Sequence, residues 1–245
     1  MIVTGGASGI GLACARALAA VGRAVALWDI YADKARAEAA AITAQTGVPA
    51  LGIGVDLADL AAYACAIDAS RAALGTIGGL VHAAGVVDTG SLDGLDEEVW
   101  ARGIDVHLRP LAMLAKALLG DLAANPGSAI VGIASINATL GNALNPVYSA
   151  AKGGMLSLIR SMADRLARDG VRINAVSPGQ ILTPMLSPTV DALPAGTFER
   201  RILLGPLGAA EEVARAVRFL LSQEASYVTA VELVVDGGNI SSQRM

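Results

Sequence analysis

Short apolar runs alternate along this chain with longer alanine-rich stretches, and this alternation restricts the fold more than any other feature. Each run is apolar at consecutive positions, as in strands that are buried on both faces of a sheet. The stretches between the runs are long enough for helices. Because buried strands joined by helices form right-handed crossovers, we expect an α/β fold. Its centre is expected to be a Rossmann-like, doubly wound parallel sheet of about seven strands with helices on both faces.

The runs and stretches locate the expected elements. Strands are expected at Met1–Thr4, Ala24–Asp29, Leu51–Val55, Gly79–His82, Ala129–Ala134, Val171–Val176 and Glu232–Val235. Helices are expected at Ile10–Val21, Ala32–Thr46, Ala58–Ala73, Glu97–Leu122, Pro146–Asp169 and Glu211–Leu221. The segment Leu182–Gly208 holds four prolines and is too long for an ordinary connection. Its apolar side chains favour a lid or substrate-binding loop over a disordered surface loop.

Size and composition limit the chain to a few classes. With 245 residues, 54% hydrophobic and 16% charged, we expect one domain over residues 1–245 and exclude a disordered chain. The net charge is −4 and no basic run occurs, so nucleic acid is not an expected partner. No long apolar stretch is free of charges, so no membrane span is expected. The two cysteines, Cys14 and Cys65, and the lack of a secretion signal predict a cytoplasmic location.

A glycine-rich turn, Thr4-Gly-Gly-Ala-Ser-Gly-Ile-Gly11, joins the first expected strand to the first expected helix. A dinucleotide needs this arrangement, because glycines permit a tight turn whose backbone N–H groups reach the pyrophosphate. The helix N-terminus adds partial positive charge. A glycine-rich chain can carry such a string by chance, but its place in the first β-α-β unit favours a cofactor site. The expected cofactor contacts are Gly5, Ser8, Gly9, Ile10 and Gly11.

Two aspartates end the next two expected strands. Asp29 lies 18 residues after Gly11, where a carboxylate can accept both ribose hydroxyls of NAD and repel the 2′-phosphate of NADP. Asp56 ends the third strand, in reach of the adenine amino group. Either aspartate could instead cap a helix or a turn. The cofactor that we expect from Asp29 is NAD.

Tyr148 and Lys152 are four residues apart in an expected helix and therefore share one face. A phenol with its ordinary pKa of about 10 is a poor acid–base catalyst near neutral pH. A nearby ammonium favours the phenolate and lowers that pKa, so an acid–base tyrosine benefits from a lysine one turn away. Such a pair also occurs by accident, and it gains specificity only from the rest of the chain.

The motifs follow one another in a set order. After the glycine-rich turn come Asp56, Ser135 at the end of a strand, Tyr148 thirteen residues later, Lys152 and Pro178-Gly179. The chain thereby resembles the short-chain dehydrogenase/reductase superfamily, in its compact NAD-type branch. The resemblance extends over residues 2–238, nearly the whole chain.

The resemblance implies a role for each matching residue. Tyr148 is expected to be the acid–base residue, and Lys152 its partner, which lowers the phenol pKa and binds the nicotinamide ribose. Ser135 is expected to polarise the substrate oxygen. Beside these residues, and independently of the resemblance, Asn137 is expected to be a polar anchor for the substrate in a mostly apolar pocket wall. Further cofactor contacts are expected at Asp56, Leu57, Ala83, Ala84, Gly85, Pro178, Gly179, Ile181 and Thr183. Hydride transfer itself is chemistry that the cofactor carries.

Two positions depart from the family pattern. His82 stands where the family has the first asparagine of Asn-Asn-Ala-Gly, which usually braces the sheet, so we interpret His82 as structural. His107 stands at the family's fourth catalytic position, usually asparagine, whose main-chain carbonyl holds a water in a proton relay. A histidine keeps that carbonyl. Its ring either fills space or joins the relay, and the sequence leaves both open.

The expected function is NAD-dependent hydride transfer between the nicotinamide and a secondary alcohol or ketone. The expected substrate pocket lies beside Ser135 and Tyr148, with walls from Ile136, Asn137, Leu140, Leu144 and the 182–208 loop. Arg200 and Arg201 are its basic candidates. One alternative is a 3-ketoacyl reductase of fatty-acid synthesis, which usually prefers NADP and carries a basic residue where Ser8 stands. Another is a non-catalytic NAD-binding sensor or scaffold, which the intact Ser135, Tyr148 and Lys152 disfavour.

The resemblance also implies a homotetramer, assembled through the helices expected at 97–122 and 146–169 and through the C-terminal segment. Their apolar side chains at helical spacing, Leu111, Met113, Leu114, Leu118 and Met155, would serve a subunit interface or an ordinary core equally well. Gly153 and Gly154 lower helix stability by about 1 kcal/mol each relative to alanine. Close approach of a neighbouring helix would explain them.

Overall fold

The computed structural model describes residues 1–241. Within this range a parallel sheet of seven strands has the order β3-β2-β1-β4-β5-β6-β9. Its strands are β1 (Ile2–Thr4), β2 (Val25–Asp29), β3 (Ala50–Gly54), β4 (Gly79–His82), β5 (Ala129–Ile133), β6 (Arg172–Pro178) and β9 (Glu232–Val235). The expected doubly wound sheet is confirmed, and each expected strand lies within two residues of its predicted bounds.

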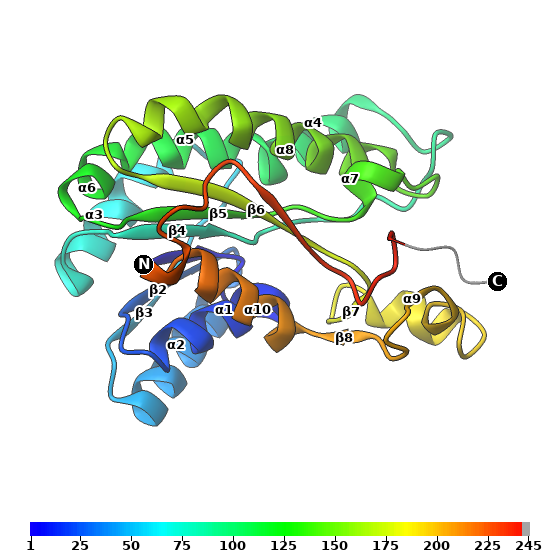
Figure 1. Ribbon diagram of the computed structural model, residues 1–245, viewed down its shortest axis with the longest axis horizontal. Coiled ribbons are helices and arrows are strands. Elements are labelled where there is room, and N and C mark those ends of the chain that lie inside the picture. The colour runs from blue at the N-terminus through cyan, green and yellow to red at the C-terminus, as the bar shows by residue number, and fades with distance from the viewer. Residues whose placement is uncertain (242–245) are drawn as a thin grey trace.

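Helices cover both faces of this sheet (Figure 1). On one face pack α1 (Gly9–Ala19), α2 (Ala32–Thr46) and α10 (Ala210–Leu220). On the other pack α3 (Ala62–Leu74), α4 (Glu97–His107), α5 (Arg109–Ala117), α6 (Leu119–Ala124), α7 (Asn137–Leu140) and α8 (Pro146–Ala167). None of the helices described is long and apolar enough to span a bilayer.

The continuous apolar runs are explained by the two cores that flank the sheet. Successive residues of a strand point to opposite faces. Val3 and Leu27 therefore enter the core beneath α1 and α10, while Ile2 and Ala26 enter the core beneath α5 and α8. Both faces are buried, so the polar alternation of a half-exposed strand is missing.

The sequence predicts one helix over 97–122, whereas the structure has α4, α5 and α6. The first break is at Leu108, with φ −105° and ψ −54°, two residues before Pro110. Proline lacks an N–H and its ring disfavours helical backbone before it, so the helix restarts with Pro110 in its first turn. Leu118, with φ −92° and ψ −1°, separates α5 from α6.

The segment 182–208, expected as a lid or substrate-binding loop, contains regular secondary structure. Its ends are joined by a short parallel ladder of β7 (Ile181–Leu182) and β8 (Gly208–Ala209). Between them lie α9 (Ser187–Ala192) and the 3-10 helix η1 (Glu199–Arg201), and a second such helix, η2 (Gln223–Ala225), follows α10. α9 and the β7–β8 pair lie together at one end of the sheet (Figure 1).

Core packing accounts for most of the apolar side chains that an interface could have used. Leu111, Leu114, Leu118 and Met155 have no exposed surface, and only Met113 of that set is exposed. The two glycines of α8 face neighbours of the same chain. A side chain at Gly153 would meet the Ala138 carbonyl of α7 at 3.5 Å, and one at Gly154 would meet Leu108 at 3.1 Å. Close packing against Leu108 therefore explains Gly154, whereas a methyl group at Gly153 would make only ordinary van der Waals contact.

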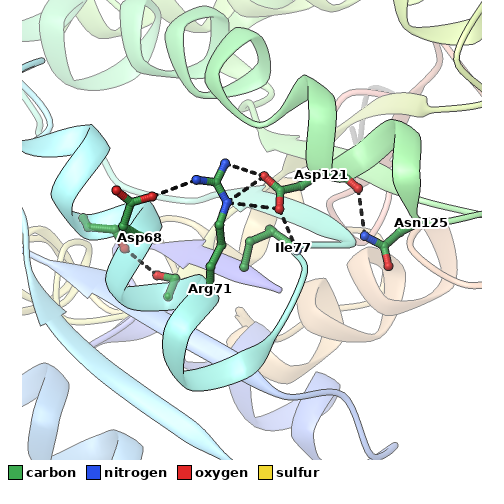
Figure 2. A network of polar contacts seen from close by, with 7 residues as sticks. Asp68, Arg71, Ile77, Asp121 and Asn125 are labelled. Atoms are coloured by element: carbon green, nitrogen blue, oxygen red, sulfur yellow. Dashed lines mark hydrogen bonds and ion pairs between the residues drawn. The ribbon is translucent and has the colours of Figure 1, made fainter.

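On the face of the sheet that carries α3 to α8, an ion pair between Arg71 and Asp121 joins α3 to α6 (Figure 2). Asp121 of α6 is 8% exposed and accepts from both Nε and Nη2 of Arg71 in α3, the latter at 2.6 Å. The same carboxylate accepts from the Ile77 N–H ahead of β4, while Asp68 binds the other arm of the guanidinium. The hydrogen bond from Arg71 holds the pKa of Asp121 below its ordinary value. Bidentate pairing with Arg71 thus balances the charge of a buried carboxylate whose other partner is a single backbone N–H.

Candidate active site

One cavity of about 1140 Å³ opens at the carboxyl ends of the strands. It lies where the strand order reverses, between β1 and β4, which is where open α/β sheets bind ligands. Every residue expected from the sequence to be catalytic or to contact the cofactor, together with Asn137, lines it. These are Gly5, Ser8, Gly9, Ile10, Gly11, Asp29, Asp56, Leu57, Ala83, Ala84, Gly85, His107, Ser135, Asn137, Tyr148, Lys152, Pro178, Gly179, Ile181 and Thr183.

The glycine-rich turn leaves a cradle beneath the N-terminus of α1. Gly9 has φ +50°, a left-handed conformation that side chains disfavour. A side chain at Gly11 would collide with the Gly5 carbonyl oxygen, so the turn packs too tightly for any larger residue. Ser8, the N-cap of α1, makes no side-chain capping hydrogen bond. The first N–H groups of the helix are thus left without a side-chain cap, which suits the pyrophosphate of a dinucleotide.

Asp29 holds the second strand end against this turn. Its Oδ2 accepts from the Ala7 N–H at 3.0 Å and its Oδ1 from the Tyr31 N–H at 3.1 Å. Each oxygen keeps a free lone-pair position, and the residue lines the cavity. Asp56 accepts from the Ala58 N–H at 2.9 Å, a turn-capping contact, and lines the same cavity. Both aspartates therefore combine the capping role and the cavity position that the sequence left as alternatives.

Ser135 and Tyr148 meet at the floor of the cavity, from the end of β5 and the first turn of α8. The Ser135 Oγ accepts from the Asn137 N–H at 3.1 Å, so its own proton is free to be donated. Burial raises the pKa of Tyr148, and a hydrogen bond with Ser135 opposes that shift. The sequence predicts a lowered pKa from Lys152, whereas burial dominates here, because the phenolate would lose more solvation than the phenol.

Lys152 lies beneath Tyr148 on the same face of α8. Its Nζ donates to the Ile133 carbonyl at 2.6 Å and sits 5.5 Å from the centre of the Tyr148 ring. Burial lowers the pKa of Lys152 to about 7. The ammonium has three donors and only one is used by Ile133, so two can serve a ligand in the cavity.

The two departures from the family pattern are in direct contact. The imidazole of His82 lies 2.9 Å from the Thr4 Oγ through Nδ1 and 2.9 Å from the His107 carbonyl through Nε2. A carbonyl only accepts, so the proton is on Nε2 and Nδ1 accepts from the Thr4 hydroxyl. The Thr4 oxygen in turn accepts from the Ala83 and Ala84 N–H groups. His82 therefore joins β1, β4 and α4, as the structural interpretation requires.

The break before α5 makes the His107 carbonyl available to His82. His107 itself is fully buried, and its Nε2 lies 2.7 Å from the Val86 carbonyl. Its ring meets Tyr148 edge-on, with centroids 5.2 Å apart, and it fills the space beside Gly85. Burial, followed by the charge of Lys152, lowers the pKa of His107 well below its ordinary value. A neutral ring that packs and bonds a neighbour favours the space-filling alternative.

The stability of the protein is expected to fall as the pH drops from 7.5 to 5. Burial lowers the pKa of His82 to about 4, against about 6.5 unfolded, so the unfolded chain binds a proton first. The stabilisation is complete above pH 6.5 and is lost as the pH falls toward 4. Over pH 7.5 to 5 this amounts to about 2 kcal/mol.

Urea unfolding across this pH range measures the loss, and His82→Asn is the comparison, because asparagine can bridge without titrating. The variant is expected to show a shallower slope of unfolding free energy against pH. Identical slopes in the wild type and the variant would contradict the assignment of the loss to His82.

Replacing His107 by asparagine is expected to leave kcat near the wild-type value and the pH profile of kcat/KM unchanged. The variant keeps the main-chain carbonyl, and the lowered pKa keeps the native ring from titrating near neutral pH. Steady-state kinetics across the pH range is the measurement. Loss of one ionisation from the profile would instead put the imidazole in the proton relay.

The cavity also has walls that the sequence did not indicate. Val86, Val87 and Thr89 follow Gly85 in irregular backbone, and Glu98, Arg102 and Asp105 contribute from α4. Their positions depend on how this loop and α4 fold over the strand ends, which has no periodic signal. Leu140, expected in the wall, is 59% exposed and does not line the cavity. Of the two loop arginines, Arg201 lines it and Arg200 does not.

Comparison with known families places the chain among oxidoreductases. A family model described as enoyl-(acyl carrier protein) reductase matches residues 5–239. The cis-4-hydroxycyclohexanecarboxylate dehydrogenase of Sinomonas cyclohexanicum is 39% identical over 241 residues, covering 97% of this chain and 94% of that protein. The 3-oxoacyl-(acyl-carrier-protein) reductase of Escherichia coli is 34% identical over 237 residues, covering 97% and 95%.

A solved structure of a reductase agrees with this result. The crystal structure of L-sorbose reductase from Gluconobacter frateurii, in complex with NADPH and L-sorbose, superposes with a TM-score of 0.91. It is 26% identical in sequence, and the match covers 99% of this chain and 96% of that one.

Proposed function

This chain belongs to the short-chain dehydrogenase/reductase superfamily and is an oxidoreductase of CH–OH groups, and on that premise we propose that NAD is its cofactor. The observation that carries the proposal is the convergence of Ser135, Tyr148 and Lys152 in the same cavity as the uncapped N-terminus of α1. Asp29 supports NAD over NADP, because its carboxylate lines the cavity at the end of β2.

The residues present fit a nicotinamide dinucleotide. The α1 N-terminus and the glycine turn would hold the pyrophosphate, Asp29 the adenosine ribose, and Lys152 the nicotinamide ribose through its two unused donors. When bound, the nicotinamide supplies or accepts the hydride.

The protein's own task is to orient the substrate oxygen and to move one proton. In the reductive direction the Ser135 hydroxyl donates to the substrate oxygen, while Tyr148 gives its proton to the oxygen as negative charge develops there. A raised pKa keeps the phenol protonated and ready to donate near neutral pH. In the oxidative direction Tyr148 acts as the base, so its phenol oxygen must first lose its proton. The positive charge of the Lys152 ammonium favours this deprotonation.

We propose that the substrate is an alicyclic secondary alcohol with an apolar ring and a single carboxylate. Leu144, Leu186, Leu193 and Phe198 give the cavity an apolar wall. Arg201 lines the same cavity, and no ion pair joins it to a carboxylate within residues 1–241. The alicyclic hydroxy acid in the name of the Sinomonas relative has this chemistry.

A substrate panel with NAD, read by the absorbance of the reduced nicotinamide, tests the proposal. It pairs cis-4-hydroxycyclohexanecarboxylate with cyclohexanol and adds polyols and linear hydroxy acids. We expect turnover, with a higher kcat/KM for the acid of the matched pair. Activity confined to 3-oxoacyl thioesters with NADPH would favour the ketoacyl reductase. Cofactor binding without turnover of any alcohol or ketone would favour a sensor or scaffold.

We also propose a homotetramer in a reducing, cytoplasmic compartment. Both cysteines are free, Cys14 buried and Cys65 exposed, which supports a reducing environment. On the helices of the expected interface, Trp100 and Met113 remain exposed at 50% and 39%. Light scattering on the purified protein tests the assembly.

A further inference from the structure

We infer that Asp88 is a positioning residue that holds the catalytic tyrosine by its backbone, an inference that rests on the proposed function of Tyr148. Asp88 lies in the irregular loop between β4 and α4, sixty residues before Tyr148 in the chain. Its Oδ1 accepts from the Tyr148 N–H at 3.0 Å and its Oδ2 lies 3.4 Å from the Val147 nitrogen, which donates to it.

The first turn of α8 depends on this carboxylate. A helix leaves its first N–H groups without intrahelical partners. Pro146, the first residue, has no N–H, and the N-cap Asn145 makes no side-chain capping hydrogen bond. Asp88 takes the N–H groups of Val147 and Tyr148, and Ser149 is the first to bond back, to the Asn145 carbonyl at 3.1 Å. Every donor of this turn is thereby satisfied, and two of them by one distant residue.

The loop that carries Asp88 is itself tied to the approach to α8. The Ser91 N–H donates to the Leu144 carbonyl at 3.1 Å. Both segments wall the cavity, through Val87 and Thr89 on one side and Leu144 and Asn145 on the other. A carboxylate at a helix N-terminus is also favoured by the helix dipole. The side chain of Asp88 thus sets where α8 begins, and through α8 where the Tyr148 hydroxyl stands relative to Ser135.

Asp88→Ala is expected to lower kcat by about tenfold to a hundredfold, since small misplacements of a reacting group have effects of this size. The cofactor KM is expected to stay unchanged. Asp88→Asn is expected to lose less kcat than Asp88→Ala, because its one amide oxygen can keep the shorter bond from the Tyr148 N–H, while its NH2 group cannot accept from the Val147 N–H. Exchange of the Tyr148 amide proton should be faster in the alanine variant and near wild type in the asparagine variant.

Asp96→Ala is the matched control. Asp96 is the N-cap of α4 and accepts from the Val99 N–H at 2.8 Å, so its loss also removes one helix cap. Asp96→Ala should lower Tm by about as much as Asp88→Ala does, and it should leave kcat unchanged. A wild-type kcat in Asp88→Ala, an equal loss in the control, or an asparagine variant as impaired as the alanine variant would overturn the inference.

Two further arms keep the test decisive. If the alanine variant does not fold, Asp88→Ser, which leaves one acceptor for two donors, is expected to show a lower kcat and a faster Tyr148 amide exchange than the wild type. A wild-type kcat in the serine variant with wild-type amide exchange would overturn the inference. If the wild-type enzyme turned over no substrate, only the proposed function would be refuted. Amide exchange needs no substrate, so it would still test whether Asp88 holds the Tyr148 backbone.

Discussion

Replacing Tyr148 by phenylalanine is expected to lower kcat by about 10²- to 10⁴-fold, the usual contribution of a positioned acid–base group. The change removes one oxygen and keeps the ring. The edge-on contact with His107 and the Lys152 cation near the ring face therefore remain. Cofactor affinity is expected to stay near the wild-type value, because the glycine turn and Asp29 are untouched. Steady-state turnover and a fluorescence titration with the cofactor measure the two quantities.

Tyr227→Phe controls for the loss of a phenol as such. Tyr227 is fully exposed and lies outside the cavity lining, so kcat in this variant should match the wild type. Near-normal turnover in Tyr148→Phe would refute the acid–base role. A large fall in cofactor affinity would instead mean that the hydroxyl serves binding, and the kcat loss could no longer be assigned to proton transfer.

The strands and the glycine turn were open to prediction because each rests on a local pattern. Continuous apolar runs identify strands that pack on both faces, and the glycine turn is followed at once by α1. Because the carboxyl ends of parallel strands meet at one edge, residues that end β1, β2 and β5 had to gather there. Asp29 was found in this way, whereas the roles of Ser135, Tyr148 and Lys152 came from the resemblance to the family.

The features that the sequence did not reveal depend on contacts between distant segments. The apolar periodicity of α4 continues through Leu108 into α5, which favours one continuous helix. Pro110 is the only residue in the sequence that indicates the break, and the prediction gave it less weight than the periodicity. His82 and His107 were taken as separate departures, since they are 25 positions apart in the chain and their contact requires the α4 terminus to reach β4. The direction of the Tyr148 pKa likewise depends on burial, which residue spacing does not report.

The largest further effect is expected in cofactor choice, where NAD should exceed NADP in kcat/KM by at least about 100-fold, or about 2.7 kcal/mol. A 2′-phosphate would add charge against Asp29, whose oxygens are held by the Ala7 and Tyr31 N–H groups and cannot turn away freely. Two unit charges about 4 Å apart interact by about 4 kcal/mol at an effective dielectric constant of about 20, so repulsion of this size is sufficient. The nearby Arg36 is engaged by Asp33 at 2.8 Å.

Asp29→Ser should bring the NAD-to-NADP ratio of kcat/KM to within about tenfold, because serine removes the charge and can still accept from the Ala7 N–H. Asp59→Ser is the matched control. It makes the same change in net charge after the neighbouring strand β3, but Asp59 is exposed, lies outside the cavity lining and is in no ion pair within residues 1–241, so the ratio should hold. Equal kcat/KM for both cofactors in the wild type would remove the case for NAD and strengthen that for a ketoacyl reductase. A ratio that moves equally in both variants would mean that the general negative charge of this corner, and not the Asp29 carboxylate, sets the preference.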